Sequence, residues 1–184
     1  LRALGPRRWI GAGLAGALAP DFAVGQVLIA QAVRDAEGPV EEGPDPAWAA
    51  RALDRAPAAR GARLVSSPRI AVTSREKAAL REAGGDRADA VDMESAGWAR
   101  AAQAAGHGAP YLLARIVSDS ADEDLPDSLA RSLAADGSLD RARIAREALL
   151  RPASIGKLLR LRRHARACAR ALAEFLDRFA AAGF

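Results

Sequence analysis

The stretch VDMESAGWARAAQAAGHGAPYLLARIVSDSAD, residues 91–122, decides the fold expected of this chain. It opens with the polar tetrad Asp92-Met93-Glu94-Ser95 and continues in a run of helical composition that ends near His107. A Gly-Ala-Pro turn follows, then an apolar strand over residues 111–117, and then Ser118-Asp119. The pattern predicts one strand–helix–strand unit with a carboxylate at the carboxyl end of each strand.

Two carboxylates beside those strand ends, Glu94 and Asp119, are the candidate functional pair. Ligands of open α/β sheets bind just beyond the carboxyl ends of the strands, so we expect both side chains to face one pocket. The alternative is that Asp92 and Glu94 only cap the helix over residues 95–107, because carboxylates are favoured at helix N-termini. Capping explains Glu94 but leaves the carboxylate after the second strand without a role.

The N-terminal part alternates between strand-like and helix-like segments, which predicts a layered α/β sheet that is largely parallel. Residues 34–46 are charged and rich in Pro and Gly, which predicts a loop. A helix over residues 77–83 is expected to follow the capping-type residues Thr73-Ser74-Arg75-Glu76. The predicted strands cover residues 8–13, 27–33, 62–66, 70–72 and 89–92, and a further predicted helix covers residues 48–57.

After Asp122 the sequence predicts helices over residues 126–134, 139–150 and 155–181. The last helix carries an apolar stripe at spacings of three and four residues, which is the helical period. Its opposite face is basic, and no acidic residue occurs between Arg151 and Ala173. The stripe consists of Leu158, Leu161, Ala165, Cys168, Leu172, Phe175 and Phe179, and the basic face of Arg160, Arg162, Arg163, Arg166 and Arg170.

Composition narrows the class of protein. A chain of 184 residues, 50% of them hydrophobic, can bury one substantial core, so a single domain is expected. The lone Cys168 excludes an internal disulfide and leaves no metal-binding cluster, which favours a reducing compartment. No apolar run is long enough to span a membrane and no signal peptide is visible, so we expect a cytoplasmic location.

The order VDME, helix, then R-I-V-S-D-x-A-D resembles the nucleoside phosphorylase and nucleosidase superfamily, of the purine nucleoside phosphorylase and methylthioadenosine/adenosylhomocysteine nucleosidase type. Upstream, residues 10–20 and 24–27 are similar to the glycine turn and the strand entry of the same superfamily. Downstream, residues 122–126, 136–140 and 149–152 resemble a narrower branch, the hopanoid-associated phosphorylases. The resemblance covers nearly the whole chain.

The resemblance implies a three-layer α/β/α domain over residues 1–184, with a mixed, largely parallel sheet and a helical C-terminus. The segment 8–13 resembles an internal strand of that sheet. We therefore expect the first strands and the first phosphate-binding loop of the superfamily to precede Leu1, and the 184-residue chain to have little activity alone.

The implied activity is cleavage of the N-glycosidic bond of an adenine nucleoside, with adenosylhopane of hopanoid biosynthesis as the substrate of the narrower branch. By the resemblance, Asp119 protonates a purine ring nitrogen, a role that calls for partial burial at the end of an apolar strand, and Ser118 orients it. Glu94 accepts hydrogen bonds from both ribose hydroxyls, and Met93 packs on the sugar face.

The glycine-rich segment is expected to form a base or phosphate loop from Gly13, Ala15 and Gly16, with Ile70 lining the base. A plain tight turn that needs positive φ is the alternative. Many phosphorylases have a serine where this chain has Leu14, and an arginine where it has Gly11. Whether phosphate or water attacks therefore stays open, and phosphate is the one co-substrate considered, with no cofactor and no metal.

The expected partners are a small nucleoside, free or lipid-linked, and further copies of the chain, because the superfamily is usually oligomeric. The basic helix face over Arg160 to Arg170 is a solvated surface, an anionic-lipid contact or a nucleic-acid patch. A formal net charge of only +4, with 23 acidic residues, argues against nucleic acid. The rival function is a catalytically incomplete binding domain of the same fold that associates with a membrane surface or nucleic acid.

Overall fold

The computed structural model describes residues 8–38, 40–41, 43–83, 87–104, 110–126 and 155–181. The helices expected over residues 126–134 and 139–150 fall outside this part almost entirely, as does the end of the helix expected to reach His107. The elements are β1 (Trp9–Ala17), β2 (Val27–Asp35), β3 (Val40–Glu41), α1 (Pro46–Arg55), β4 (Arg60–Ser66), α2 (Ser74–Glu82), β5 (Ala90–Asp92), α3 (Ser95–Ala104), β6 (Tyr111–Asp119) and α6 (Ile155–Ala181).

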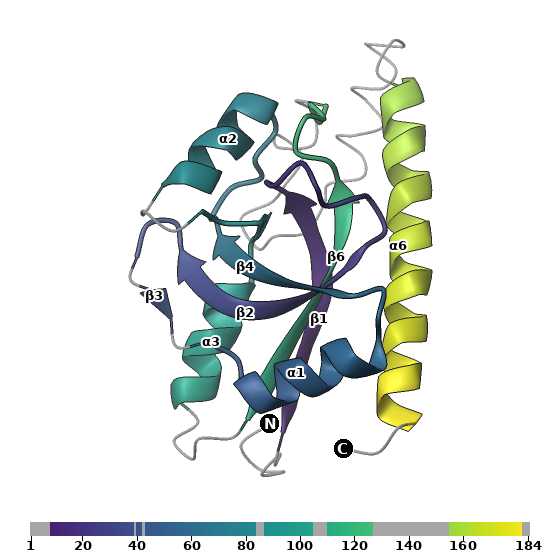
Figure 1. Cartoon of the computed structure of the whole chain (residues 1–184). Coiled ribbons are helices and arrows are strands. Elements are labelled where there is room, and N and C mark those ends of the chain that lie inside the picture. Colours follow the sequence, from purple (N-terminus) through teal and green to yellow (C-terminus); the bar gives the residue numbers. More distant parts are fainter. Residues whose placement is uncertain are drawn as a thin grey trace.

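Six strands of the described chain form one mixed sheet in the order β3-β2-β4-β5-β1-β6, and β2 also pairs with β6. The extra pairing closes five strands into a ring, and Figure 1 shows β2 crossing β1 and β6. The pairs β1–β6, β2–β4 and β4–β5 are parallel, whereas β1–β5, β2–β3 and β2–β6 are antiparallel. The α/β class with a mixed sheet is therefore confirmed.

The strands β5 and β6 run in opposite directions, whereas the prediction of a shared pocket requires them to run in the same direction. Both strands flank β1, but β5 is antiparallel to it and β6 is parallel to it. The carboxyl ends of β5 and β6 therefore point in opposite directions along the sheet. Gly16 of β1 is the meeting point, because it lies opposite Val91 on one side and opposite Asp119 on the other.

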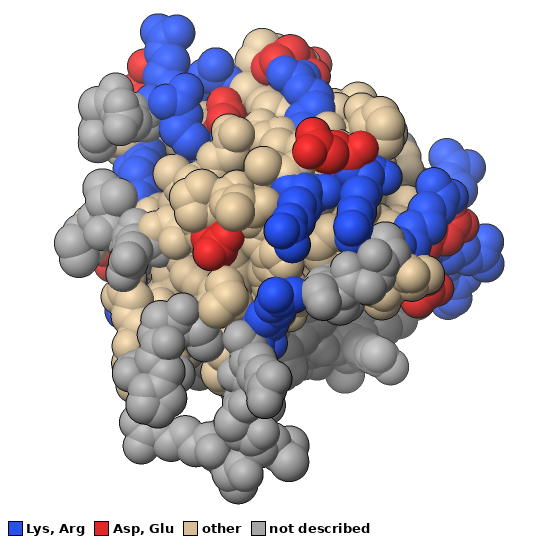
Figure 2. Space-filling model, turned by 60° about the horizontal axis from the view of Figure 1, so that its bottom comes forward, with Lys and Arg blue, Asp and Glu red and all other residues tan. Residues whose placement is uncertain are grey.

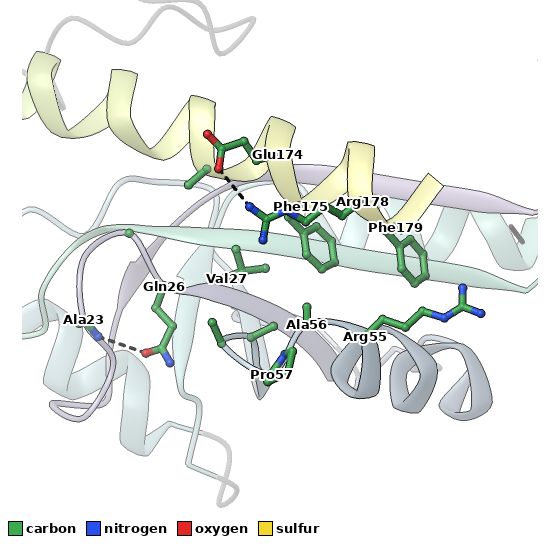
Figure 3. Close-up of a pocket in the computed structure, with 14 residues that line it drawn as sticks. Ala23, Gln26, Val27, Arg55, Ala56, Pro57, Glu174, Phe175, Arg178 and Phe179 are labelled. Carbon is green, nitrogen blue, oxygen red and sulfur yellow. Dashed lines mark hydrogen bonds and ion pairs between the residues drawn. The ribbon is translucent and has the colours of Figure 1, made fainter. Parts of the chain in front are cut away.

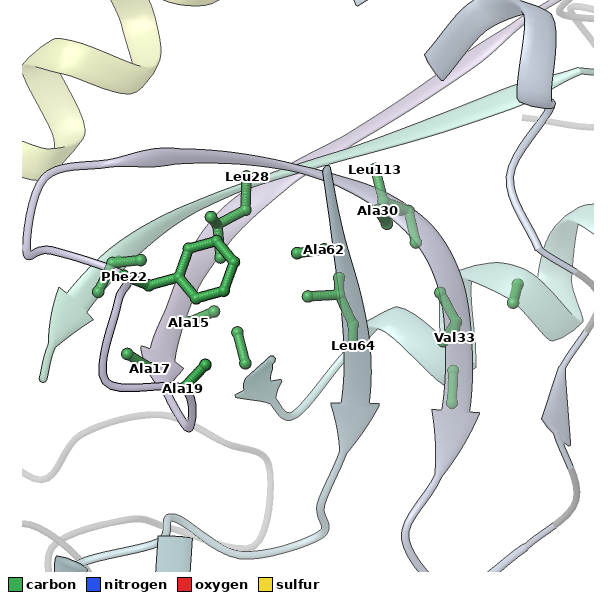
Figure 4. Close-up of a cluster of buried hydrophobic side chains, with 14 of the residues drawn as sticks. Ala15, Ala17, Ala19, Phe22, Leu28, Ala30, Val33, Ala62, Leu64 and Leu113 are labelled. Atoms are coloured by element: carbon green, nitrogen blue, oxygen red, sulfur yellow. The ribbon is translucent and has the colours of Figure 1, made fainter. Parts of the chain in front are cut away.

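The core is divided between the two faces of the strands, as period-two alternation requires. In β6, Tyr111, Leu113 and Val117 belong to one buried cluster, whereas Leu112, Ala114 and Ile116 belong to another that includes α1 and α6. The first cluster gathers Phe22 and Leu28 with many alanines, whose small side chains let α3 approach the strands closely (Figure 4).

The long C-terminal helix α6 has the predicted bounds and the predicted buried stripe. Cys168, Leu172, Phe175 and Phe179 are all buried in the second cluster. Phe175 and Phe179 stack with their ring centroids 5.8 Å apart, and Trp48 of α1 meets Phe179 edge-on at 6.2 Å. Figure 1 shows α6 along one side of the sheet, where this face covers strands that water would otherwise reach. The side chains of Leu158 and Leu161 lie outside the described part.

The glycine-rich segment is a strand, so the turn expected in both sequence interpretations is wrong. Gly11, Gly13 and Gly16 all lie inside β1. A Cβ added at Gly11 would lie 2.5 Å from the Leu113 side chain, so the absence of a side chain at Gly11 makes room for Leu113 of β6. Among the described residues the glycine with positive φ is Gly25, at +89°, in the connection to β2.

Two smaller expectations also change. Residues 70–72 form no strand and instead connect β4 to α2 in an irregular conformation. The segment 34–46, expected to be a loop, contains the short strand β3, which pairs antiparallel with the end of β2. The predicted cap of α2 is confirmed as a capping box, in which Thr73 accepts from the Glu76 backbone and the Glu76 side chain accepts from the Thr73 backbone.

Candidate active site

Asp119 ends the apolar strand β6 and is held from several sides. It is 5% exposed. The Ser118 hydroxyl lies 2.6 Å from its Oδ1 and 3.2 Å from the carbonyl oxygen of Ala15, and the shorter contact is the stronger hydrogen bond. The Nζ of Lys77 lies 2.6 Å from Oδ2. The structure thus brings Ser118 and Asp119 together as the sequence predicted, and adds a buried cation beside them.

Gly16 and Ala15 also lie beside Asp119, although as strand residues and not as a loop. The register between β1 and β6 shifts between Ala15 and Gly16, so that Gly16 comes opposite Asp119. A Cβ at Gly16 would stand 2.9 Å from Oδ2 of Asp119. Glycine at this position therefore lets β1 pass close to the carboxylate, where a larger residue would collide with Oδ2.

Met93 and Glu94 follow the short strand β5 and have exposed side chains, that of Met93 being 39% exposed. The Glu94 carbonyl oxygen accepts from Trp98 N at 3.0 Å, which begins α3. Because neighbouring strands are about 4.8 Å apart, Val91 and Asp119, on either side of β1, lie within about 10 Å of one another. Glu94, whose side chain is exposed, follows Val91 by three residues.

Two other predicted residues have different surroundings. A Cβ at Gly13 would lie 3.4 Å from the guanidinium group of Arg115, so Gly13 accommodates that buried side chain. Ile70 is half-buried in the connection between β4 and α2. Neither contacts Asp119 among the interactions of the described residues.

Asp92 is the centre of a buried polar network that sequence reasoning treated only as a helix cap. It does cap α3, because its Oδ1 accepts from the Ser95 backbone at 3.1 Å. Its carboxylate also accepts from Arg115 Nε at 2.6 Å, from the Ser66 hydroxyl at 2.7 Å and from the Ser95 hydroxyl at 2.5 Å. Arg115 is fully buried, and its Nη2 has no partner among the described residues.

The surroundings of Asp92 lower its pKa. Burial disfavours the charged carboxylate, but the Arg115 charge and the hydrogen bonds from Ser95, Arg115 and Ser66 outweigh burial and hold the pKa of Asp92 below its ordinary value. One signal for this network was present in the sequence, namely a single arginine in the middle of the otherwise apolar segment 111–117.

Lys77 is the second residue that sequence reasoning missed. It is 1% exposed and lies in α2, whose cap the sequence did predict. The available signal was its spacing from Leu80, one helical turn away on the face that packs against the third buried cluster. A lysine on a packing face needs a partner, because an unpaired buried charge is costly.

A cavity of about 540 Å³ lies elsewhere, between the C-terminal half of α6, the end of α1 and the start of β2. Val27, Phe175 and Phe179 form its apolar wall, and Arg55 and Arg178 lie at its rim (Figure 3). It contains none of the predicted site residues. We place the candidate site at Asp119, because titratable and hydrogen-bonding groups from β1, β6 and α2 converge there.

Neither a metal-ion cluster nor a membrane-spanning helix occurs among the described residues. Those residues include no cluster of three or more His, Cys, Asp or Glu that could hold a metal ion. None of the helices formed by them combines the length and the apolar composition needed to cross a membrane.

The fold is that of an α/β protein, with helices packed on a mixed sheet that closes on itself. Its polar site contains a buried aspartate at the end of a strand, which pairs with a lysine. The family comparison makes this specific, because the model of the phosphorylase superfamily matches residues 1–152. The chain belongs to the phosphorylase superfamily. No curated protein sequence matches it.

Solved structures agree with this fold. The S-adenosylhomocysteine nucleosidase of Streptococcus pyogenes is 17% identical, with a TM-score of 0.69 over 96% of this chain and 68% of that one. The futalosine hydrolase of Helicobacter pylori is 18% identical, with a TM-score of 0.68 and the same coverage. A Weissella paramesenteroides protein described as a methylthioadenosine nucleosidase is 22% identical, with a TM-score of 0.57, and the chain spans 60% of its length.

Proposed function

We propose that the protein cleaves the N-glycosidic bond of a purine nucleoside, with Asp119 as the acid at the departing base. The observation that carries the proposal is the buried Asp119 carboxylate at the end of β6, held by the Ser118 hydroxyl at Oδ1 and by Lys77 at Oδ2. Membership of the phosphorylase superfamily and structural neighbours named as nucleosidases support the reaction class.

The chemistry assigns each residue a task. The base departs neutral only if a ring nitrogen receives a proton, and Asp119 delivers it, with Ser118 fixing the orientation of the carboxyl group. The ribose acquires positive character as the bond breaks, so Glu94 accepts hydrogen bonds from its hydroxyls and Met93 packs on the sugar face. No metal or organic cofactor has a task in this scheme.

The finer substrate that we propose is an adenine nucleoside, and within that class adenosylhopane. The acceptor is either phosphate or water. Chromatography of the products that the protein at its natural length forms from adenosine, methylthioadenosine and adenosylhopane, with and without phosphate, tests both points. Free adenine with a ribose phosphate indicates phosphorolysis, and free adenine with unphosphorylated sugar indicates hydrolysis. If no substrate releases adenine, the proposal is wrong.

Glu94→Gln tests the ribose assignment. We expect it to lower kcat/KM for the natural nucleoside by an amount equivalent to about 2–4 kcal/mol, because hydrogen bonds to a charged acceptor are lost in a preorganised site. A 2′,3′-dideoxynucleoside provides the control, since it offers no hydroxyl to Glu94 and should be affected far less. An equal loss on both substrates would remove Glu94 from the ribose site.

The exposed arginines of α6 favour a second role for this helix, contact with an anionic lipid surface. Arg162, Arg163, Arg166 and Arg170 are exposed on α6, and no acidic side chain pairs with them among the described residues. On the face shown in Figure 2, basic and acidic side chains lie among one another. Each basic side chain near an anionic bilayer contributes about 1 kcal/mol to membrane binding. A basic helix would therefore hold the protein at the membrane from which a lipid-linked nucleoside is taken.

Reversing Arg163 and Arg166 to Glu should weaken binding to anionic vesicles by at least about 30-fold, the equivalent of about 2 kcal/mol. Turnover of soluble adenosine should not change. The matched control reverses Arg51 and Arg75, two exposed arginines of α1 and α2, and should bind as the parent does. Co-sedimentation at low and high salt measures the effect. Equal binding by both double variants would make the α6 face an ordinary solvated surface, and tight binding without adenine release from any nucleoside would favour the pure binding domain.

A further inference from the structure

One charged side chain of α2, that of Lys77, points into the protein. Its Nζ lies 2.6 Å from Oδ2 of Asp119 and donates to the carbonyl oxygens of Ser120 at 2.6 Å and Glu123 at 2.9 Å. An ammonium group has three N–H donors, and three acceptors surround this one. Lys77 is therefore a fully satisfied buried cation that is paired with the proposed acid.

The same lysine holds the segment that follows Asp119, residues 120–125, which we call the strap. The strap is also tied to the start of α2, because Leu125 N donates to Val72 O at 2.8 Å and Ser74 N donates to Asp124 Oδ1 at 2.7 Å. The ammonium group of Lys77 contacts both the strap and the carboxylate. The side chain of Lys77 therefore links the strap to the Asp119 carboxylate.

We propose that Lys77 is a positioning residue for the glycosidic cleavage, which fixes the orientation of the Asp119 carboxyl group. This inference rests on the proposed function. Ser118 holds Oδ1 and Lys77 holds Oδ2, so two donors from different elements fix the carboxyl plane. A Cβ at Gly16 would lie only 2.9 Å from Oδ2, so glycine there lets β1 approach the carboxyl group closely.

Two other titratable groups lie near the pair. From α6, Cys168 faces this region, where burial raises the pKa of its thiol and the Asp119 charge adds to that effect. From the strap, Asp122 has a lowered pKa, mainly because the Ser120 hydroxyl donates to it, with a smaller contribution from the Lys77 charge. Lys77 is the cation in contact with Asp119, so replacing Lys77 should affect the Asp119 carboxyl group directly.

The experiment compares two leaving groups in the protein at its natural length. Adenine needs a proton to depart, whereas 4-nitrophenol departs from 4-nitrophenyl riboside as a stable anion without one. We expect Lys77→Met to slow adenine release at least 10-fold more than nitrophenol release.

Two further variants make the result decisive. Arg75→Met removes a positive charge from the exposed face of the same helix and should leave both rates unchanged. If Lys77→Met fails to fold, Lys77→Arg decides, because it keeps the charge but displaces the carboxylate with a longer, planar group. Selective loss of adenine release then supports the inference. An equal effect of the Lys77 variant on both substrates would show that Lys77 only holds α2 to β6.

The inference and the proposed function fail in different ways. If Asp119→Asn keeps adenine release, the acid is misassigned, whatever the Lys77 variants do. If Asp119→Asn loses adenine release selectively and Lys77→Met changes both leaving groups equally, the proposed function stands and the positioning role of Lys77 is wrong.

Discussion

Replacing Asp119 with Asn is expected to lower kcat for adenine release by about 10²–10⁴-fold, the usual contribution of a positioned general acid. The amide has nearly the shape of the carboxyl group but cannot deliver a proton to the base. Release of 4-nitrophenol from its riboside should be largely retained, because that leaving group needs no acid. Equal retention of both activities would remove Asp119 from the acid role.

The buried Lys77 complicates this variant in a way that the sequence did not reveal. An amide at position 119 leaves the ammonium group without its counter-charge, and breaking a buried ion pair in this manner costs about 3–5 kcal/mol. The double variant Asp119→Asn/Lys77→Met removes both charges and should unfold at a higher urea concentration than Asp119→Asn alone. Its adenine release should stay as low as that of the single variant. Recovery of stability without recovery of activity would separate the chemical role of Asp119 from its structural one.

Arg115→Met should reduce the free energy of unfolding by about 3–5 kcal/mol at neutral pH, because it leaves the buried Asp92 carboxylate without its cation. Arg115 and Asp92 have side chains only 1% and 3% exposed, with 2.6 Å between Nε and Oδ2. The matched control is Arg100→Met, which breaks a 2.8 Å ion pair with Asp35 at a site where the arginine is 53% exposed. It should cost no more than about 1 kcal/mol. Urea unfolding measures both, and similar losses would contradict the burial argument.

The pH dependence of the Arg115 effect follows from the sign of the Asp92 pKa shift. In the parent this pKa lies below the ordinary value, so the stabilising contribution is present above about pH 3.9 and is lost as pH falls through the folded-state pKa. In Arg115→Met the carboxylate is buried without its cation, so it takes up a proton at higher pH, and protonation relieves the penalty. The stability difference between parent and variant should therefore shrink as pH is lowered toward 4. A difference independent of pH would mean that packing, and not charge, dominates.

Local sequence was sufficient for most of the elements. The bounds of α6, its buried stripe, the capping box of α2 and the strand over residues 111–117 follow from helical period, capping chemistry and apolar runs, which act over a few neighbouring residues. The same local signals placed Ser118 and Asp119 at the end of an apolar strand. They also identified the family, because the spacing of its motifs is a property of the chain alone.

Only the tertiary structure decided how the strands run and which charges meet. A glycine cluster is compatible with either a turn or a strand. Only the side chains of β6 across the sheet explain why β1 has glycines at these positions. The opposite directions of β5 and β6 follow from the closing of the sheet through β2 and β6. Lys77 reaches Ser120 across 43 residues, and Arg115 reaches Asp92 across 23. Periodicity reports which face of an element is buried, but the partner of a buried charge is set by packing between elements distant in sequence.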